Sequence, residues 1–240
     1  MTTRRPVKAA RPQLVAVIAS SADLDAAIAI KRQPDLFELR LDSLSPITSR
    51  LEKKISRLRA PLIITARDPR EGGTGKLSFE KRSDLLLEFL PRARYVDIEL
   101  RSARKFESLL ARAQKQKIGR ILSYHNFKSI PTSRSLYAKA RMAGSLGADI
   151  FKVAIRTDTP AAVARLIDFI TRKDVRHAVG GRGDRRRVDL SISAMGIGPL
   201  GAISRLLLAR CGSALNYASL GQPNVEGQLS VALLRSALGR

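Results

Sequence analysis

The stretch GRILSYHNFKSIPTSRSLYAKARMAGSLGADIFKVAIR, residues 119–156, contains the unit from which the chain is built. Residues 119–125 and 150–156 are short apolar runs with the length and composition of buried strands. Between them, residues 133–147 place apolar side chains at helical spacing. A strand, a helix and a second strand in this order form a parallel βαβ unit. The stretch therefore predicts an α/β fold with a parallel sheet.

The same alternation recurs along the whole sequence. Further strands are predicted over 14–20, 36–42, 61–67, 95–100, 187–194 and 215–220, and helical patterns follow them, as at 78–90 and 201–210. Eight βα units in 240 residues match the size of a closed parallel barrel, whereas a doubly wound sheet usually has fewer strands. We therefore predict a single (β/α)8 TIM barrel over residues 13–240, preceded by a basic, flexible tail over residues 1–12.

The composition indicates a folded protein with a large excess of positive charge. Hydrophobic residues make up 44% of the chain, and 44 Lys and Arg against 21 Asp and Glu give a formal net charge of +23. No apolar run approaches the roughly 20 residues that span a bilayer, so no membrane partner and a cytoplasmic location are expected. Cys211 is the only cysteine, which argues against an internal disulfide and against a structural zinc.

The positive charge raises the question of nucleic-acid binding. The cations are spread along the chain, aromatic residues make up only 5%, and no known nucleic-acid-binding motif is present. The densest basic segment, Arg182 to Arg187, lies between periodic elements in a Gly-rich stretch, which is typical of a solvated loop. We expect no specific nucleic-acid partner, and the sequence gives no reason for the size of the excess.

Lys152 lies in the middle of the apolar run 150–155, where an ammonium group is costly to bury. Such a lysine is often an amine nucleophile, although a snorkelling or salt-bridged lysine is the structural alternative. His125, one of two histidines, ends another apolar run and is either a proton-transfer group or a hydrogen-bonded core histidine. Together, an amine and an imidazole suggest Schiff-base chemistry.

Strand alternation assigns the side chains to two faces of the predicted sheet. One face is apolar and is expected to pack beneath the helices: Phe37, Leu39, Leu41, Leu62, Ile64, Val96, Ile98, Phe151, Val153 and Ile155. The other face is polar and would point into the barrel lumen: Glu38, Arg40, Thr65, Arg67, Asp97, Glu99, Ser123, His125 and Lys152. We therefore expect a polar, charged lumen instead of an aliphatic one. A neutralised buried ion network is the alternative to an active site.

Two Gly-rich segments imitate phosphate-binding motifs. Residues 196–201 (GIGPLG) fit the GxGxxG pattern, but the segment contains Pro199, falls in the seventh unit and has no acidic residue about 20 positions later. It is expected to form a tight turn. Residues 71–76 (EGGTGK) lack the first glycine and the final Ser or Thr of a P-loop, and a mobile loop over the third strand is expected instead.

Several segments, in order and spacing, resemble the type I 3-dehydroquinate dehydratases. They are FELRLD (37–42), ITARDPREGG (64–73), YVDIEL (95–100), SYHNF (123–127), ADIFKVAI (148–155), ISRLLLARCGSAL (203–215) and GQ (227–228). The resemblance extends over about residues 14 to 238. It implies a (β/α)8 barrel, usually a homodimer, that dehydrates 3-dehydroquinate to 3-dehydroshikimate in the shikimate pathway with no metal or organic cofactor.

The resemblance also implies a role for particular residues. Lys152 matches the Schiff-base lysine, His125 the general base and acid, and Glu71 the glutamate that orients this histidine. The expected substrate-binding set is Arg205 for the carboxylate, Glu38, Arg40 and Arg67 for the ring hydroxyls, and Gln228 and Asn224 from the lid.

The lid is where the sequence departs from the family pattern. The usual SAPGQ reads NVEGQ over residues 224–228, so Glu226 is expected to bring a negative charge near an anionic substrate. The spacing from Met195 to Arg205 is longer than usual, which leaves the place of Met195 open.

Two other functions remain open from the sequence. A different Schiff-base barrel lyase, such as a class I aldolase, would use Lys152 without needing the His125, Glu71, Arg205 and Gln228 set. A non-catalytic barrel would bind polyanions through its basic surface.

Overall fold

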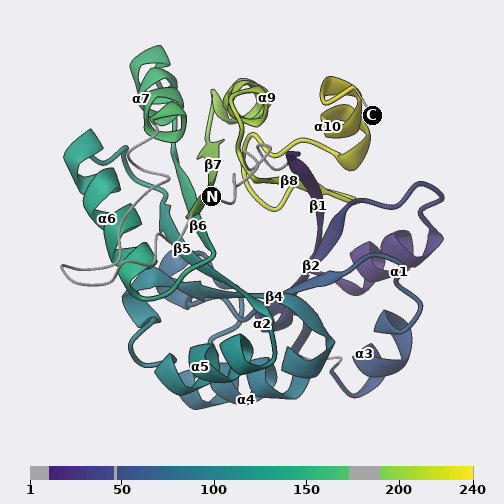
Figure 1. The fold of residues 1–240 in the computed structure, drawn as a ribbon. Coiled ribbons are helices and arrows are strands. Elements are labelled where there is room, and N and C mark those ends of the chain that lie inside the picture. Colours follow the sequence, from purple (N-terminus) through teal and green to yellow (C-terminus); the bar gives the residue numbers. More distant parts are fainter. Residues whose placement is uncertain (1–10, 46–47, 173–189, 240) are drawn as a thin grey trace, which may run out of the picture.

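The computed structural model describes residues 11–45, 48–172 and 190–239, so residues 1–10 of the predicted 1–12 tail and the Arg182 to Arg187 segment lie outside the described residues. Eight parallel strands form a nearly closed ring, with helices around its outside (Figure 1). The strands are β1 (Gln13–Ile18), β2 (Leu36–Arg40), β3 (Leu62–Thr65), β4 (Ala93–Glu99), β5 (Gly119–Asn126), β6 (Ile150–Arg156), β7 (Ser191–Ile197) and β8 (Leu215–Ser219). The prediction of a (β/α)8 barrel is confirmed.

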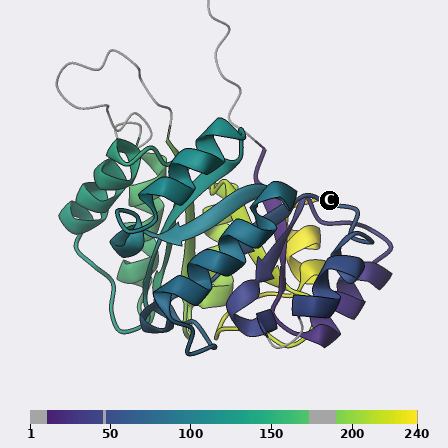
Figure 2. The same cartoon turned by 90° about the horizontal axis from the view of Figure 1, so that it is seen from below.

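Helices connect the strands and run alongside them, as the turned view shows (Figure 2). They are α1 (Ser21–Ala29), α2 (Leu41–Leu44), α3 (Thr48–Ile55), α4 (Phe79–Phe89), α5 (Glu107–Lys115), α6 (Ser133–Ser145), α7 (Pro160–Thr171), α9 (Gly201–Arg210) and α10 (Val231–Ala237). Three short 3-10 helices are η2 (Pro69–Glu71), η3 (Leu90–Arg92) and η4 (Leu100–Ser102). None of the helices described is long and apolar enough to cross a membrane.

Side-chain caps fix where several helices begin. Thr132 and Thr159 accept hydrogen bonds from backbone N–H groups in the first turns of α6 and α7, and Ser20 and Ser78 do the same for α1 and α4. These caps satisfy N–H groups that have no partner within the helix. The helices therefore start directly after the loops that line one end of the barrel.

The strand order places β1 between β8 and β2, and each further strand beside its neighbour in sequence up to β7. β7 and β8 meet through a backbone bond from Ala214 N to Ile192 O at 2.8 Å and through Ser193 Oγ, which donates to Leu215 O at 2.7 Å. Because all strands run parallel, their carboxyl ends open on one face, where barrel enzymes hold their active sites.

The seventh strand differs from its predicted range of 187–194. Residues 187–189 of that range lie outside the described residues; β7 runs over Ser191–Ile197 and so takes in Gly196, which was expected to begin a tight turn. A Cβ on Gly196 would lie 2.1 Å from Ser204 Oγ and 2.4 Å from Thr157 Oγ1. Glycine therefore lets α9 pack directly against the end of this strand.

The apolar face predicted from alternation packs under the helices as expected, but the prediction of a lumen without aliphatic filling is wrong. A second apolar cluster lies in the barrel interior: Val15, Val17, Leu36, Ile63, Ile121, Ile150, Ala154, Met195, Ile197, Leu215 and Tyr217. Several of these strands are apolar on both faces, so alternation gave no contrast there. The charged side chains share the barrel interior with this apolar cluster.

Exposed cations lie at the opposite end of the barrel, where the strands begin. Lys31, Arg32, Arg57, Arg59 and Lys117 lie in the connections that lead into β2, β3 and β5. None of the five forms an ion pair with a described carboxylate. Part of the charge excess is therefore remote from the carboxyl ends of the strands.

Candidate active site

A cavity of about 790 Å³ opens at the carboxyl ends of the strands. All of the predicted site residues line it: Glu38, Arg40, Glu71, Arg67, His125, Lys152, Arg205, Asn224 and Gln228. They come from strands, loops and helices between β2 and α10, so only the closed barrel brings them together. The volume of the cavity suits a small-molecule ligand.

Lys152 occupies the floor of this cavity. The side chain points inward from the middle of β6 and the residue is only 4% exposed. Its Nζ lies 2.9 Å from Asp97 Oδ2 and 3.3 Å from Glu38 Oε1. Lys152 is therefore salt-bridged, as the structural alternative predicted. It also lines the open cavity.

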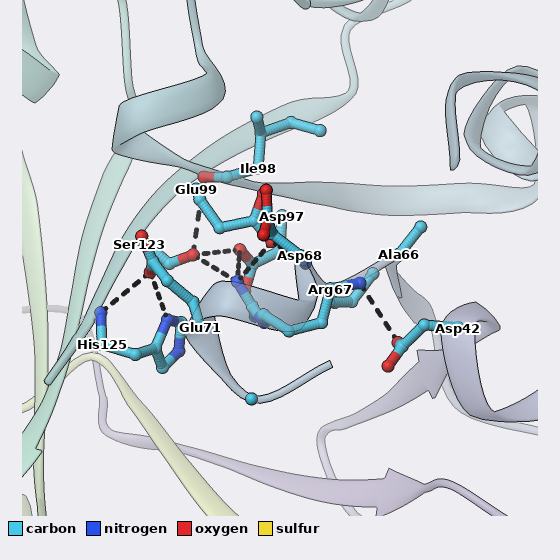
Figure 3. Close-up of polar contacts among 12 residues, drawn as sticks. Asp42, Ala66, Arg67, Asp68, Glu71, Asp97, Ile98, Glu99, Ser123 and His125 are labelled. Carbon is cyan, nitrogen blue, oxygen red and sulfur yellow. Dashed lines mark hydrogen bonds and ion pairs between the residues drawn. The ribbon is translucent and has the colours of Figure 1, made fainter. Parts of the chain in front are cut away.

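Asp97 connects Lys152 to Arg67. Arg67 donates to both Asp97 oxygens at 2.9 and 3.2 Å, to Glu99 at 3.2 Å and to Ser123 Oγ at 2.6 Å. Burial disfavours the Asp97 carboxylate, but the charges of Arg67 and Lys152 outweigh it and hold the pKa of Asp97 well below its usual range. The neutralised network predicted as an alternative is thus present; Figure 3 shows Arg67 among Asp97, Glu99 and Ser123. Of its members, Arg67, Lys152 and Glu38 line the cavity.

His125 and Glu71 form a pair at the cavity wall. Glu71 ends the short helix η2 after β3, and its Oε2 lies 3.0 Å from both His125 Nδ1 and His125 N (Figure 3). The second contact holds the carboxylate against the backbone of β5. The group that contacts the imidazole is therefore itself held in place, and this fixes the orientation of the ring. This leaves Nε2 as the ring nitrogen available for proton transfer.

Burial shifts both members of the pair toward their neutral forms. Desolvation, with the like charge of Glu99, raises the pKa of Glu71 to about 7. Desolvation, with the cations Arg67 and Lys152, holds the pKa of His125 well below its usual range. At neutral pH the imidazole is therefore an unprotonated base, and Glu71 is the member of the pair whose pKa lies close to neutral pH.

This titration predicts the pH dependence of turnover. We expect kcat/KM to rise with pH through about 7, because ionised Glu71 holds the Nδ1 proton and makes Nε2 more basic. Glu71→Gln should remove that limb and lower kcat by about one to two orders of magnitude. Initial rates between pH 5.5 and 9 measure this. If Glu71→Gln keeps the pH dependence of the parent, another group is responsible for it. Glu88→Gln, on the outside of α4, is the control and should keep that dependence.

Arg40 and the loop after β3 form one rim of the cavity. Arg40 donates to Asp42 at 2.8 and 3.0 Å and to Gly72 O at 3.2 Å, and Ser43 Oγ lies 2.6 Å from Thr74 Oγ1. These bonds join the loops that follow β2 and β3. Gly72 has φ +88°, a left-handed conformation that suits glycine, so the loop turns sharply after Glu71.

Arg205 is a buried cation that forms no ion pair with any carboxylate in the described part of the chain. It projects from α9, is 5% exposed, and donates through Nη1 to Tyr217 O at 3.1 Å. Its Nε has no hydrogen-bond partner among the described residues, and burial lowers its pKa to about 10. An anionic ligand in the cavity would supply the missing acceptor.

The segment after β8 covers the cavity from the other side. Gln228 Oε1 accepts hydrogen bonds from Asn224 N at 2.7 Å and Asn224 Nδ2 at 3.3 Å, so both lid residues lie together. The Glu226 side chain is 59% exposed and lies 4.0 Å from Arg156. The expectation that Glu226 brings its charge near the substrate is not met, because it does not line the cavity and faces a cation.

The GxGxxG segment positions this lid. A Cβ on Gly201 would lie 2.9 Å from Gly227 Cα, and Gly198 N donates to Glu226 O at 3.1 Å. The glycines permit close contact between α9 and the lid, and their role is structural. Met195, whose place was open, lies on β7 beside Ala154 and lines the cavity.

Tyr217 is the main cavity residue that the sequence did not reveal. It lies on β8 and lines the cavity floor opposite β6, with its ring 3.9 Å from Lys152 Nζ. Its neighbours in LNYAS are mostly apolar or small, so nothing in that run marked it as a site residue. Ser20, Asp23 and Phe127 also line the cavity without having been predicted.

Comparison with known proteins identifies the family of this chain. Residues 14–239 match the family model of type I 3-dehydroquinase. The 3-dehydroquinate dehydratase of Methanothermobacter thermautotrophicus is 32% identical over 88% of this chain and 87% of its own length, and that of Pyrococcus abyssi is 34% identical over 85% and 86%. The crystal structure of the Geobacillus kaustophilus 3-dehydroquinate dehydratase has a TM-score of 0.80 at 26% identity, covering 95% of this chain and 90% of that one. The chain therefore belongs to the type I 3-dehydroquinase family, the 3-dehydroquinate dehydratases (EC 4.2.1.10) of the shikimate pathway.

Proposed function

We propose that this enzyme dehydrates 3-dehydroquinate through an imine formed on Lys152. The observation that carries the proposal is a buried lysine amine sharing one cavity with an unprotonated histidine and an arginine that lacks an anion. Each of these groups is costly to bury alone, and together they match an anionic ketone substrate.

The imine would turn the substrate ketone into an electron sink. Lys152 Nζ, after losing one proton, bonds to C3, and the ketone oxygen leaves as water, giving a protonated imine. His125 Nε2 then takes a proton from C2, and the C–H electron pair moves toward the cationic nitrogen to form an enamine. The enamine expels the C1 hydroxyl, to which His125 returns the proton, so a second water leaves. Hydrolysis of the imine consumes one water and frees Lys152 and 3-dehydroshikimate.

The remaining residues would hold the substrate in register. Arg205 would bind its carboxylate, since a fork of N–H donors suits two carboxylate oxygens. Glu38, Arg40 and Arg67 would accept from or donate to the ring hydroxyls, although Arg67 already uses several N–H groups on Asp97, Glu99 and Ser123. Gln228 and Asn224 would close over the bound acid.

The contacts favour this reaction over the alternatives. A class I aldolase would not need both the His125–Glu71 pair and a buried carboxylate receptor such as Arg205. A non-catalytic polyanion-binding barrel would not need a buried cavity with a compensated lysine at its floor. Family membership agrees with the dehydratase.

Trapping of the imine tests the proposal. The enzyme is incubated with 3-dehydroquinate and borohydride, turnover is followed by the enone absorbance of the product, and peptides are mapped by mass spectrometry. We expect a reduced adduct on Lys152 and loss of activity that depends on both reagents. A folded, substrate-saturated enzyme that turns over without an adduct on Lys152 would rule out the imine.

His125→Ala separates imine formation from proton transfer. We expect the variant to form the adduct but to lose about 10²- to 10⁴-fold in kcat, the usual contribution of a general base. Adduct yield and turnover are measured on the same sample. Normal turnover by this variant would remove His125 from the proton-transfer step.

Arg205→Lys tests the carboxylate contact. Lysine keeps the charge but loses the fork, so KM should rise at least tenfold, in line with a lost charge-assisted hydrogen bond, while the imine still forms. Arg210→Lys, at the exposed end of the same helix, is the matched control. Equal KM values for the two variants would contradict the assignment.

The homodimer and the cytoplasmic location stay predictions. Light scattering after size-exclusion chromatography measures the oligomeric state. A dimer mass of about twice 26.3 kDa is the expected result.

A further inference from the structure

The face of the Tyr217 ring lies directly against the Lys152 nitrogen. Nζ is 3.9 Å from the ring centroid, closer than in the other cation–ring contacts of the described residues. Tyr217 is 4% exposed and projects from β8, while Asp97 and Glu38 reach the same nitrogen from β4 and β2. The nitrogen thus has two carboxylates and one aromatic face around it.

The hydroxyl of Tyr217 has no comparable role. Its Oη is buried and has no hydrogen-bond partner among the described residues. Burial, together with the charges of Glu38 and Asp97, holds the pKa of Tyr217 well above its usual range, so the phenol stays neutral. A buried hydroxyl without a partner is unfavourable, which indicates that the ring is the useful part of this side chain.

The backbone of Tyr217 links the two ends of the cavity. Its carbonyl accepts the Arg205 Nη1 hydrogen bond at 3.1 Å. One residue of β8 therefore contacts both the amine of Lys152 and the guanidinium of Arg205. A shift of β8 would therefore disturb the contacts of both the Lys152 amine and the Arg205 guanidinium.

The geometry points to Tyr217 as a positioning residue that uses its ring face to keep the Lys152 nitrogen in place and positively charged, both as the ammonium and as the protonated imine. The inference rests on the imine proposed above. An ammonium plus a ketone gives a protonated imine plus water, so the nitrogen carries one positive charge on both sides of that step. It has three N–H groups before the step and one after it.

This loss of N–H groups gives the ring its particular value. A single N–H can donate to one of Asp97 and Glu38, so one carboxylate hydrogen bond is lost when the imine forms. An aromatic face attracts a cation through its quadrupole and needs no N–H donor. It therefore continues to stabilise the cationic nitrogen, and only the protonated imine draws electrons from C2 effectively.

The groups that face this nitrogen define the pH experiment. They are Glu38 from β2, Asp97 from β4, His125 from β5 and Tyr217 from β8, with Arg67 behind Asp97. The variants below change Tyr217 alone and leave the other four residues in place. Tyr217→Phe keeps the ring and removes the unpartnered hydroxyl, and Tyr217→Leu keeps an apolar side chain without a ring.

The first measurement needs no substrate. Ionisation of Lys152 is followed through the pH dependence of reductive methylation, quantified at that residue by mass spectrometry. We expect Tyr217→Phe to match the parent and Tyr217→Leu to raise the acid dissociation constant of the ammonium about tenfold, since a desolvated cation–π contact favours the cation by about that factor or more. Tyr217→Phe variants whose introduced ring carries one, two or three fluorines should raise this acid dissociation constant stepwise, because fluorine weakens the quadrupole of the ring at nearly constant shape.

The second measurement follows the alkaline limb of borohydride trapping with 3-dehydroquinate, which reports loss of the imine proton. This limb should move to lower pH in Tyr217→Leu and in the fluorinated series, in the same order. If all variants share one methylation profile and one limb, the ring is packing only and the inference is overturned. If no variant or parent forms an adduct but the methylation series holds, the imine fails and the ring contact stands. The thermal midpoint of Tyr217→Phe, expected to equal or exceed that of the parent, checks folding.

Discussion

Lys152→Met is expected to abolish the covalent adduct and to lower kcat by at least three orders of magnitude. Methionine has nearly the same length, but it lacks the nitrogen that would bond to the substrate, so no electron sink forms. Turnover is measured by the enone absorbance of the product, and the adduct by mass spectrometry after borohydride. The expected residual activity is that of a binding site that orients its substrate without the imine.

The control must separate lost chemistry from lost structure. Methionine also leaves Glu38 and Asp97 without one of their cations, which could disturb the fold. Lys152→Arg keeps the charge, and arginine cannot act as a neutral nucleophile at ordinary pH, so it should lose turnover to the same extent. Lys54→Met, which breaks an exposed pair with Asp25, should leave both readouts unchanged. Substantial turnover by folded Lys152→Arg would contradict the mechanism.

The sequence was sufficient to predict the barrel and one half of its lumen. Around Glu38 in β2 and Lys152 in β6 a charged residue stands between two apolar ones, as in Phe37, Glu38 and Leu39, so alternation gave the direction of these side chains. The same rule failed for β1 and for the first half of β5. Val15 and Ile121 point into the lumen, while the apolar Leu14 and Leu122 point out.

The pairing of charges inside the lumen could not be predicted in the same way. Alternation placed Glu38, Asp97, Glu99 and Arg67 on one face, but which carboxylate contacts Lys152 depends on strand stagger and tilt. In the structure Asp97 contacts both Lys152 and Arg67. Glu99 contacts Arg67 and Arg82. Arg82 comes from α4, outside the lumen pattern, and no local sequence signal connects it to Glu99.

The aromatic contact was missed for a related reason. A cation–π contact leaves no charge pattern in the sequence, and Tyr217 belongs to a strand that reads as core. Its importance follows only from the position of β8 relative to β6, which lie on either side of β7 once the ring closes. The lid residue Glu226 was misjudged because its partner Arg156 comes from a different βα unit.

Arg67→Met is expected to cost about 3–5 kcal/mol of unfolding free energy, the usual penalty for removing one partner of a buried ion pair. Arg67 is buried, and its loss leaves the buried carboxylates of Asp97 and Glu99 with fewer donors. For a chain of this size the thermal midpoint should fall by about 10 °C. Arg92→Met, which breaks an exposed pair with Glu52, is the matched control and should cost under about 1 kcal/mol.

The acid dependence and a double variant identify the cause. Arg67 and Lys152 hold the pKa of Asp97 below its usual range, so this group stabilises the fold above about pH 4 and loses that contribution as pH falls toward its folded value. Arg67→Met should therefore show a weaker loss of stability on acidification than the parent. Adding Asp97→Asn should restore part of the midpoint, because the uncompensated charge is removed. If Arg67→Met costs no more than Arg92→Met, or the double variant is simply additive, the buried network does not support the fold as described, and Arg67 would be free to serve the substrate alone.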